Sequence, residues 1–284
     1  MPRQKTAPVR RSFLFYMAIA ALQCYGEGMH HGTTTTQNRR AFSLVELSIV
    51  LAIIGLLIGG VLSGQSLIRA AELRSLMTDM NSFTSAVQNF RDQYKALPGD
   101  MLNATNYWGA AHATPATCTS TIGTGTQTCN GTGDGLVSGP NGGTIDLNER
   151  FRFWQHLSNA GFITGTFTGV STPVNGGGTS LGVNVPKSRL ANSGYSALSE
   201  ASAPFLADSY FNVIPPNNII FTGAQAAGSD TFAQNMTSAE AFNIDTKADD
   251  GKPGYGNVQS YRLGSPLVSS CTTSVTATAA NYAL

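Results

Sequence analysis

A single carboxylate stands near the start of the longest apolar run in this sequence. From Phe42 to Leu62 the only charged residue is Glu46, and the only other polar side chains are those of Ser43 and Ser48. Such a run can cross a bilayer as a helix, because about 20 apolar residues at 1.5 Å each match a hydrocarbon core of about 30 Å. A carboxylate there costs about 2.5 to 3.5 kcal/mol at mid-membrane and usually has a partner that compensates. The chemistry expected of Glu46 is therefore ion pairing.

Two hypotheses account for this carboxylate. In the first, the run is an uncleaved signal anchor, and Glu46 lies close enough to the interface to stay hydrated. In the second, the chain is cut between Ala41 and Phe42, which creates an α-amine four residues from the carboxylate of Glu46. We favour the second, because a basic pair, a small residue, Phe and a lone Glu at this spacing seldom coincide by chance before a spanning run.

The segment from Arg39 to Glu46 and the apolar run after it resemble the cleavage and methylation segment of type IV prepilins and type II secretion pseudopilins. The resemblance implies that a prepilin peptidase cuts before Phe42 and that its new amine is methylated. It also implies that Glu46, fifth in the mature chain, guides assembly with other pilin or pseudopilin subunits at an inner-membrane assembly platform. The family usually has glycine before the cut, where this chain has Ala41, so we expect slower processing.

The sequence predicts four parts along the chain. Residues 1–41 form a leader, with Met29 as an alternative start, and residues 42–62 form a transmembrane or filament-core helix. Residues 63–97 form the amphipathic continuation of that helix, and residues 98–284 form a periplasmic head. We expect one helix over 42–96, about 80 Å long at 1.5 Å per residue.

One face of the second helical part is apolar. Its apolar residues recur at alternating steps of three and four, which predicts a face that packs on the head. A coiled-coil dimer is the alternative, although the flanking charges show no regular pattern. The residues are Leu73, Leu76, Met80, Phe83, Val87, Phe90, Tyr94 and Leu97.

Four glycines lie in and just after the apolar run. Gly55 and Gly59 form one small-x-x-x-small pair, and Gly60 and Gly64 form another. Such pairs let helices approach closely in lipid, while each glycine weakens a helix by about 1 kcal/mol. We expect a helix-packing face here, a place where the helix loosens in the filament, or both.

The charge distribution predicts the orientation in the membrane. Six of the 17 Lys and Arg residues lie in residues 1–41, with only one of the 16 Asp and Glu residues. The positive-inside rule then places the N-terminus in the cytoplasm and the head in the periplasm, as part of a periplasmic or cell-surface filament after assembly. The mature chain has a net charge of about −4, which argues against general nucleic-acid binding. Membrane lipid is the expected non-protein partner.

The fold class expected is α+β, with the long helix packed on a small β-sheet head that carries extra short helices and long loops. Gly, Ser, Thr and Asn are abundant from Thr114 on, which suits a loop-rich extracytoplasmic head. Turn, cap and strand signals predict these elements: a short helix capped by Asp100 and running through Trp108, a helix after Asn148 that ends at Gly161, strands over 208–214 and 217–223 joined by a tight connection, a helix over 238–244 and a closing strand over 258–263.

The cysteines of the head indicate one short-range bridge. Cys118 and Cys129 close a short Gly- and Thr-rich loop and are our first choice for a disulfide, while pairing of Cys271 with either remains open. A metal site formed by these cysteines is not expected, because no paired Cys-x-x-Cys or nearby histidine supports it. His156 lies beside the apolar face of its helix and is expected to be a satisfied or surface histidine.

Two short polar runs have a spacing at which oxygen ligands can bind calcium. In the first, Asn130, Thr132 and Asp134 open a calcium-loop pattern whose twelfth position is Asn141, where an EF-hand has glutamate. In the second, Asp245, Asp249 and Asp250 lie in a Gly- and Pro-rich turn with Gly251 and Pro253. Turn chemistry explains the Asn-Gly and Asp-Gly pairs equally well, and we favour turns over metal at the first run. No cofactor is therefore expected, with calcium as the alternative.

The function expected is structural. We find no P-loop, dinucleotide fingerprint or catalytic triad, so we do not expect an enzyme. The prediction is a pilin-like subunit of a type II secretion pseudopilus or a type IV pilus, and the large head favours a minor or specialised subunit. The alternative is an uncleaved, membrane-anchored periplasmic binding protein or enzyme.

Overall fold

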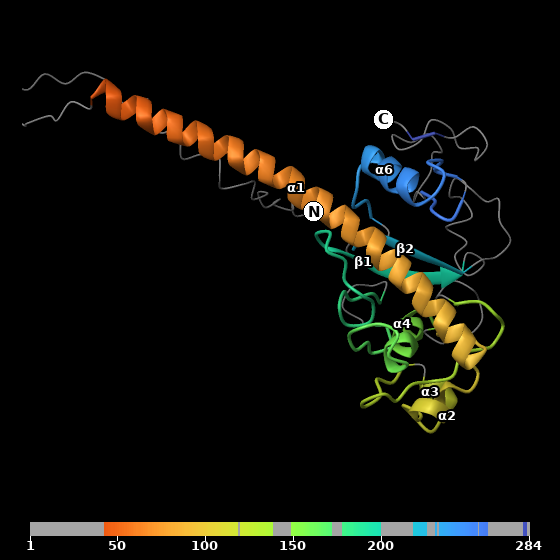
Figure 1. Cartoon of the computed structure of the whole chain (residues 1–284). Helices are drawn as coiled ribbons and strands as arrows, with labels where there is room; N and C mark the ends of the chain where they lie inside the picture. Colours follow the sequence, from red (N-terminus) through yellow and green to blue (C-terminus); the bar gives the residue numbers. More distant parts are fainter. Residues whose placement is uncertain are drawn as a thin grey trace, which may run out of the picture. The chain divides into compact units, whose positions relative to one another are not determined.

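The structure is a computed structural model that describes residues 43–118, 120–138, 149–171, 178–199, 218–225, 231, 233–254, 256–260 and 281–282. Figure 1 shows its elements: α1 (Leu44–Tyr94), α2 (Ala104–Trp108), α3 (Pro115–Cys118), α4 (Glu149–Asn159), β1 (Ser193–Ser199), β2 (Asn218–Ala224) and α6 (Ser238–Ala248). A long N-terminal helix, short helices and a small antiparallel sheet confirm the α+β prediction. The chain divides into two compact units, Met1–Leu56 and Leu57–Leu284.

The long helix agrees with its prediction to within two residues at each end. α1 is continuous from Leu44 to Tyr94, where 42–96 was predicted. It stops at Lys95, which adopts a left-handed conformation with φ of 53° and donates its N–H to the carbonyl of Arg91 at 2.9 Å. Gly99 follows with φ of 84°, and a Cβ there would lie 2.4 Å from the carbonyl oxygen of Glu149, so the turn after the helix requires glycine.

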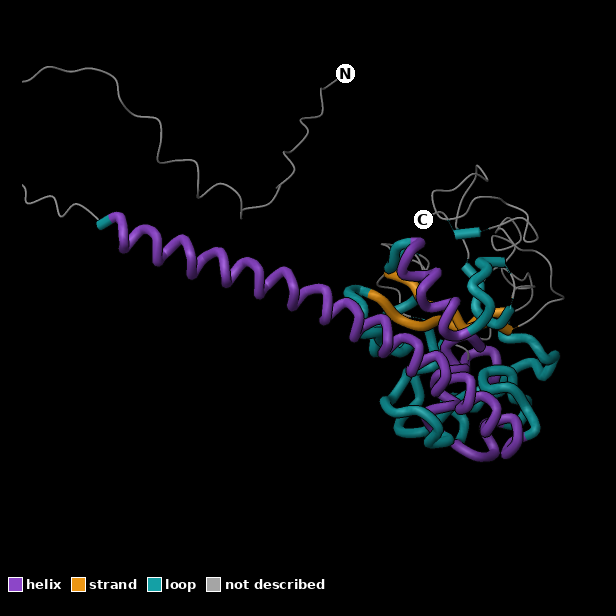
Figure 2. Tube along the Cα trace, turned by 45° about the horizontal axis from the view of Figure 1, so that its top comes forward, coloured by secondary structure: helices purple, strands orange, loops and turns teal. Residues whose placement is uncertain are grey.

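The apolar face predicted for the second part of α1 packs as expected. Leu76 and Phe90 are buried, as is Ala86, which the periodicity did not single out. Most of the other predicted residues are half-buried against two apolar clusters: Leu73, Met80, Phe83, Val87 and Tyr94. The first cluster joins α1 to α4 and β1, and the second joins α1 to Leu190 and to Ile244 of α6. Figures 1 and 2 show the strands and α6 beside this part of α1.

The helix α4 is buried along most of its length, whereas the sequence predicted a helix with one buried, apolar face. The apolar face predicted for it is buried, and every residue from Glu149 to Leu157 is buried as well. Trp154 meets Phe83 of α1 edge-on, with ring centroids 5.0 Å apart, and Phe83 meets Tyr195 of β1 at 4.9 Å. Phe83 therefore links the helix, α4 and the sheet. Asn148, the predicted cap, lies outside the described residues.

The sheet pairs β1 with β2 in antiparallel register, from Ser193 opposite Ala224 to Ser199 opposite Asn218. The strand predicted over 217–223 is thus found, but its described partner is β1. The other strand of the predicted hairpin, 208–214, lies outside the described residues. At the predicted closing strand, residues 258–260 are not in a strand, and 261–263 lie outside the described part of the chain.

The cap predicted for the first short helix of the head was wrong. α2 begins after Asn103, whose side chain makes no capping bond, and Asp100 turns instead to a different loop. Asp100 lies too far before Ala104 to cap it, because a cap must immediately precede the first helical residue. The carboxylate of Asp100 can accept N–H groups from another loop as readily as from a helix start, and in this structure it does so.

The helix α6 is tied to α1 by a polar clamp. Thr237 and Glu240 form a capping box at its start. The carboxylate of Glu240 also accepts hydrogen bonds from Arg69 of α1, at 2.6 Å from Nε and 2.9 Å from Nη2. This hydrogen bonding to Arg69 lowers the pKa of Glu240 to about 2. At the other end of α6, Tyr282 donates its hydroxyl to Asp245 at 2.9 Å.

The deepest residue of α1 gives a test of this packing. Phe90 is fully buried between α1 and α4, so we expect Phe90→Ala to lower the free energy of unfolding by about 3 to 5 kcal/mol. Thermal unfolding of the full chain in detergent, followed by circular dichroism, measures this. Thr84→Ala, which removes an exposed hydroxyl of the same helix, is the control and should leave unfolding nearly unchanged. Equal stability of the two variants would contradict the packing.

Candidate functional site

The start of α1 is organised by a serine and the lone glutamate. The backbone N–H of Ser43 donates to Oε2 of Glu46 at 2.9 Å, and the Ser43 hydroxyl accepts the N–H of Val45 at 3.3 Å. This arrangement resembles a capping box, in which a glutamate in the first turn reaches back to the residue before the helix. A negative charge is also favourable here because it faces the positive end of the helix dipole. The carboxylate of Glu46 is therefore directed towards the residue before Leu44.

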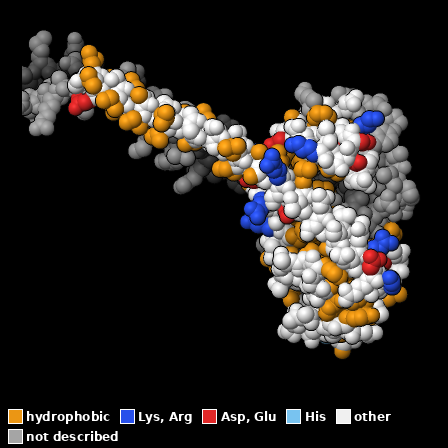
Figure 3. All heavy atoms as spheres, in the orientation of Figure 1, with side chains coloured by type: hydrophobic (Ala, Val, Ile, Leu, Met, Phe, Trp, Pro, Cys, Tyr) orange, Lys and Arg blue, Asp and Glu red, His pale blue; other side chains and the backbone are white. Residues whose placement is uncertain are grey.

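Beyond this carboxylate, α1 presents an apolar surface that no described residue covers. No charged residue occurs over 47–68, and an 18-residue window within α1 reaches a mean hydropathy of 2.5 with none of it buried. The helix is thus long and apolar enough to cross a membrane, and Figure 3 shows the apolar side chains along its surface. The exposed large apolar residues are Leu44, Val45, Leu47, Ile49, Val50, Leu51, Ile53, Ile54, Leu56, Leu57, Ile58, Val61, Leu62, Leu67 and Ile68.

The four glycines of this helix are open in the single chain. A Cβ built on Gly55, Gly59, Gly60 or Gly64 meets nothing within 4 Å. At about 100° per residue, the pair Gly55 and Gly59 lies roughly 140° around the helix from the pair Gly60 and Gly64. The glycines therefore form two separate faces, and the prediction that they pack against helices concerns other chains and stays a prediction.

In the second unit, a glycine-rich loop closes around Asp100. The carboxylate accepts N–H bonds from Gly133 at 2.5 Å, from Asp134 at 3.1 Å and from Gly135 at 2.8 Å. Gly133 and Gly135 have φ of 71° and 85°, which only glycine adopts at low cost and which turns these amides towards one acceptor. Burial raises the pKa of Asp100, although the loop amides oppose this rise.

A second buried carboxylate holds the same loop. Glu149, at the start of α4, accepts the N–H and hydroxyl of Thr132 at 2.6 and 2.9 Å and the N–H of Ser138 at 2.8 Å. Burial raises its pKa as well. Carboxylate oxygens of Asp100, Asp134 and Glu149 lie within 4.8 Å of one another. The carboxylates of Asp100 and Glu149 already accept hydrogen bonds from several donors of the loop. These bonds anchor the loop, which gives both carboxylates a structural role.

The structure places two of the three predicted calcium ligands, Thr132 and Asp134, beside the buried carboxylates. Oδ1 of Asn130 accepts the N–H of Thr105 at 2.9 Å, and the hydroxyl of Thr132 donates to both buried carboxylates. Asp134 belongs to the carboxylate cluster with Asp100 and Glu149. The run is a turn wrapped around Asp100, and calcium binding by this chain stays a prediction. Asp245, Asp249 and Asp250 gather similarly in the second polar run.

Comparison with known proteins bears on the N-terminal segment. Residues 36–62 match the family model of the prokaryotic N-terminal methylation motif. This is the segment in which the apolar run, the capping serine and the lone glutamate lie. The N-terminus is of the prepilin type. No curated protein and no solved structure matches the chain, so the comparisons describe the prepilin-type segment and not the head.

Some residues of the prepilin-type segment lie outside the described part. The structure describes Glu46 and the apolar helix but not Ala41 or Phe42, so cleavage between these two residues and methylation of Phe42 stay predictions. The motif and the apolar helix together support membrane anchoring of a pilin-like protein.

The predicted pair of close cysteines is joined in the head. Cys118 and Cys129 form a disulfide with Cα atoms 5.8 Å apart, and Cys271 lies outside the described residues. The carbonyl of Cys118 accepts a hydrogen bond from Nη2 of Arg152 in α4, at 3.0 Å. The disulfide loop is thereby attached to a helix that lies in the core. Burial lowers the pKa of Arg152 to about 10.

A buried hydrogen-bond chain runs through His156 and was not predicted in this form. Nδ1 accepts the N–H of Gly99 at 3.0 Å, which leaves Nε2 to donate to the hydroxyl of Thr128 at 3.0 Å. That hydroxyl donates in turn to Oε1 of Gln155 at 2.7 Å, which also accepts from Arg152. The histidine is satisfied, as expected, and neutral: burial lowers its pKa to about 3. Sequence spacing gave no signal for Gly99 and Thr128, the two direct partners of the histidine, which come from separate loops.

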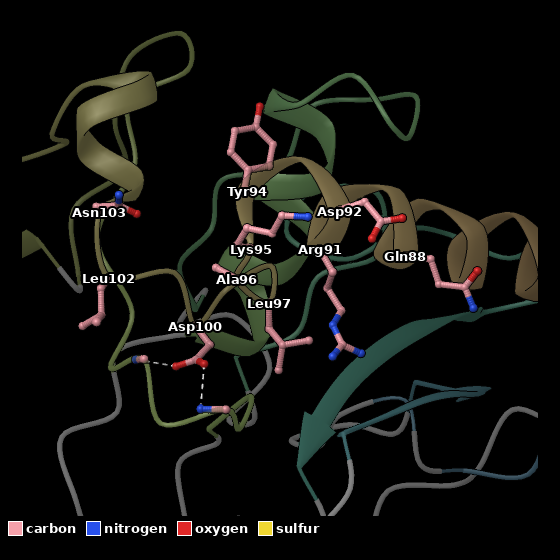
Figure 4. A pocket seen from close by; sticks show the side chains of 12 residues that line it. Gln88, Arg91, Asp92, Tyr94, Lys95, Ala96, Leu97, Asp100, Leu102 and Asn103 are labelled. Atoms are coloured by element: carbon pink, nitrogen blue, oxygen red, sulfur yellow. Dashed lines mark hydrogen bonds between the residues drawn. The ribbon is translucent and has the colours of Figure 1, made fainter.

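An open groove lies where α1 ends. It has a volume of about 1030 Å³ and is open to solvent. Figure 4 shows Arg91 and Lys95 on one side, Leu97 and Leu102 at the wall, and Asp100 turned to the loop amides. Its side chains belong to several chemical classes and do not form an acid–base pair or a nucleophile with a base.

The pH dependence of folding tests the role of His156. Its folded pKa of about 3 lies below the ordinary 6.5, so below pH 6.5 the unfolded chain gains a proton that the folded chain does not. We expect this residue to lower the free energy of unfolding by about 1.4 kcal/mol per pH unit as the pH falls from 6.5 towards 3. His156→Gln removes the titration, so its denaturant unfolding should depend less on pH over this window. The same pH slope in both proteins would contradict a neutral buried histidine.

Proposed function

We propose that this chain is a structural subunit of a type II secretion pseudopilus or type IV pilus filament. The observation that carries the proposal is the exposed apolar surface of α1 from Leu44 to Ile68, with Glu46 as its one charge, inside a prepilin-type motif. Contiguous apolar surfaces of this size mark membrane or protein contacts. Lipid covers the surface in the precursor, and the helices of other subunits cover it in the filament.

In this proposal the leader and α1 act in sequence. The precursor stays in the inner membrane, with its head in the periplasm, until a prepilin peptidase cuts between Ala41 and Phe42. The new amine of Phe42 is methylated, and an assembly platform adds the subunit to the filament. Glu46 then attracts the amine of a neighbouring subunit and sets the register between helices. This attraction is stronger among packed apolar helices than in water, and the desolvation of both charges offsets part of it.

The hydrogen bond between Glu46 and Ser43 at the start of α1 supports the role proposed for Glu46. Oε2 of Glu46 accepts the N–H of Ser43, the residue directly after Phe42. The carboxylate is thus turned towards the side of α1 on which cleavage would create the new amine. The size of the head, residues 98–284, favours a minor or specialised subunit.

A second candidate is an uncleaved, membrane-anchored periplasmic binding protein or enzyme. Two observations favour it: Ala41 in place of the usual glycine, and the groove of about 1030 Å³ at the end of α1. The motif itself belongs to proteins that serve as structural subunits, so this candidate ranks second.

Substitution of the lone glutamate tests the filament role. We expect Glu46→Ala to leave membrane insertion intact but to lower the yield of sheared filaments by at least about tenfold, the effect of losing about 1.4 kcal/mol of subunit contact. The matched control is Ser48→Ala, which removes the other polar group of the same helical turn, a hydroxyl that donates to the carbonyl of Val45. Filament yields equal to wild type in Glu46→Ala would exclude this mechanism.

The mature N-terminus distinguishes the two candidates. Mass spectrometry of the chain from its native membrane should find a methylated Phe42 as the first residue. Ala41→Gly restores the residue usual in the family and should increase the fraction of cleaved chain in a pulse-chase experiment. Peptides that span Arg39 to Ser43 intact in all of the mature protein would instead support the uncleaved anchor.

A further inference from the structure

A group of cations lies where the apolar surface of α1 ends. After Glu46 the next charged residue is Arg69, which leaves a charge-free length over 47–68 of roughly 33 Å at 1.5 Å per residue. The hydrocarbon core of a bilayer is about 30 Å thick. When this helix spans a membrane with Glu46 at one face, Arg69 lies at the level of the lipid headgroups on the other.

Arg69 itself is committed to the fold. It binds the carboxylates of Glu240 and Glu72 and the carbonyl of Asn235, and hydrogen bonding to Glu240 raises its pKa. Glu72 and Glu240 are thus both paired with Arg69. Asp79, the next acid along α1, accepts the hydroxyl of Tyr195 at 2.8 Å.

Three further cations nearby are exposed: Arg74 of α1, and Lys187 and Arg189 of the segment before β1. None of them forms an ion pair with a described residue. The loop and the helix adjoin, because Leu190 packs in one cluster with Leu73 and Met77 of α1. Figure 3 shows Lys and Arg side chains gathered beside α1 just beyond its apolar length.

We propose that Arg74, Lys187 and Arg189, here called the basic collar, bind the anionic headgroups of phospholipids while α1 is in the membrane. The inference rests on the membrane-held state of the proposed function. Arg74 lies five residues, or about 8 Å, past Arg69, and its side chain is long enough to reach back towards the headgroups. The mature chain has a net charge of about −4, so attraction to an anionic surface must come from a local patch.

The collar gives the head a defined contact with the membrane before assembly. A spanning helix alone leaves α1 and the head free to tilt against the bilayer. Charges on two elements, α1 and the loop before β1, limit this tilt when both meet the same lipid surface. Assembly into a filament breaks these lipid contacts. Anionic lipid therefore favours the membrane-held subunit over the assembled one.

Lysine footprinting on the full chain tests the collar. The chain is placed at one copy per disc in nanodiscs of phosphatidylcholine, with or without phosphatidylglycerol, and acetylation of each lysine is followed by mass spectrometry. Lys187 should react about three- to sevenfold more slowly in the anionic discs, the factor given by a surface potential of about −30 to −50 mV. Lys95 is the internal control: it is exposed and lies about 32 Å beyond Arg74 along α1, several Debye lengths away.

Two variants define the collar as a unit. Arg74→Glu with Arg189→Glu should abolish the difference between the discs at Lys187, and 0.5 M salt should do the same in the wild type. Arg91→Glu, at the far end of α1, should keep the difference. Circular dichroism of all variants checks that they are folded.

Each outcome supports or overturns the proposal. Equal labelling of Lys187 in both discs, with the chain inserted, overturns the collar and leaves the filament function standing. Slowing of Lys187 and Lys95 alike shows a general surface effect, and equal slowing in neutral discs shows a contact independent of lipid charge; both overturn it. A chain that fails to insert in either disc contradicts the membrane-held state and the proposed function with it.

Discussion

The structure depends on one continuous helix that must satisfy two different surroundings. Up to Ile68 large apolar side chains lie on every side of the helix and Glu46 is its only charge, as lipid or packed helices require, and from Arg69 on only one face is apolar. The backbone hydrogen bonds are internal throughout, which is what allows a chain to leave a membrane without exposing unpaired N–H and C=O groups. The side chains alone therefore determine which surroundings each part of the helix fits. Arg69 marks it, and the same residue holds α6 to the helix.

The head is stabilised by polar groups in its interior as well as by its apolar clusters. Two buried carboxylates gather the amides of a glycine-rich loop, and one neutral histidine joins the turn after α1 to the disulfide loop. Long loops carry backbone groups that must find partners when they are buried. Charged side chains at the start of α4 supply those partners at fixed positions. The burial of α4 on all sides follows from this, because loops cover the faces that the sheet and α1 do not.

The parts of the fold that the sequence predicted are those governed by local period and composition. The apolar run, the alternating steps of three and four on α1, and the start of α6 after a Thr-x-x-Glu pattern all depend on neighbours within one or two helical turns. The match of residues 36–62 to the methylation motif lies in the same local region. What the sequence missed depends on distant partners. Ser193–Ser199 gives no local sign that Asn218–Ala224 is its partner strand, and Asp100 finds its donors more than 30 residues away.

The predicted calcium ligands show the same limit in a functional site. The spacing of Asn130, Thr132 and Asp134 is compatible with a metal loop, yet spacing does not reveal which oxygens are already bonded. Gly133 and Gly135, on either side of Asp134, were the better signal, because a positive φ at alternate positions turns successive amides towards one anion. The sequence pattern that resembles a cation site thus forms, in this structure, a cradle for a carboxylate of the same chain.

The clamp between α1 and α6 has a mechanical consequence. A pull along α1 reaches the head first at Arg69, which passes it to Glu240 at the start of α6. Asp245, near the end of α6, is bonded to Tyr282, two residues before the end of the chain. Part of the tension applied to the helix is thereby carried across one short helix to the C-terminal segment, while the bond between Asp79 of α1 and Tyr195 of β1 carries another part into the sheet. The clamp at Arg69 is the first of these contacts along α1, so a pull on the apolar end of the helix meets a polar link before it meets the apolar core between α1 and α4.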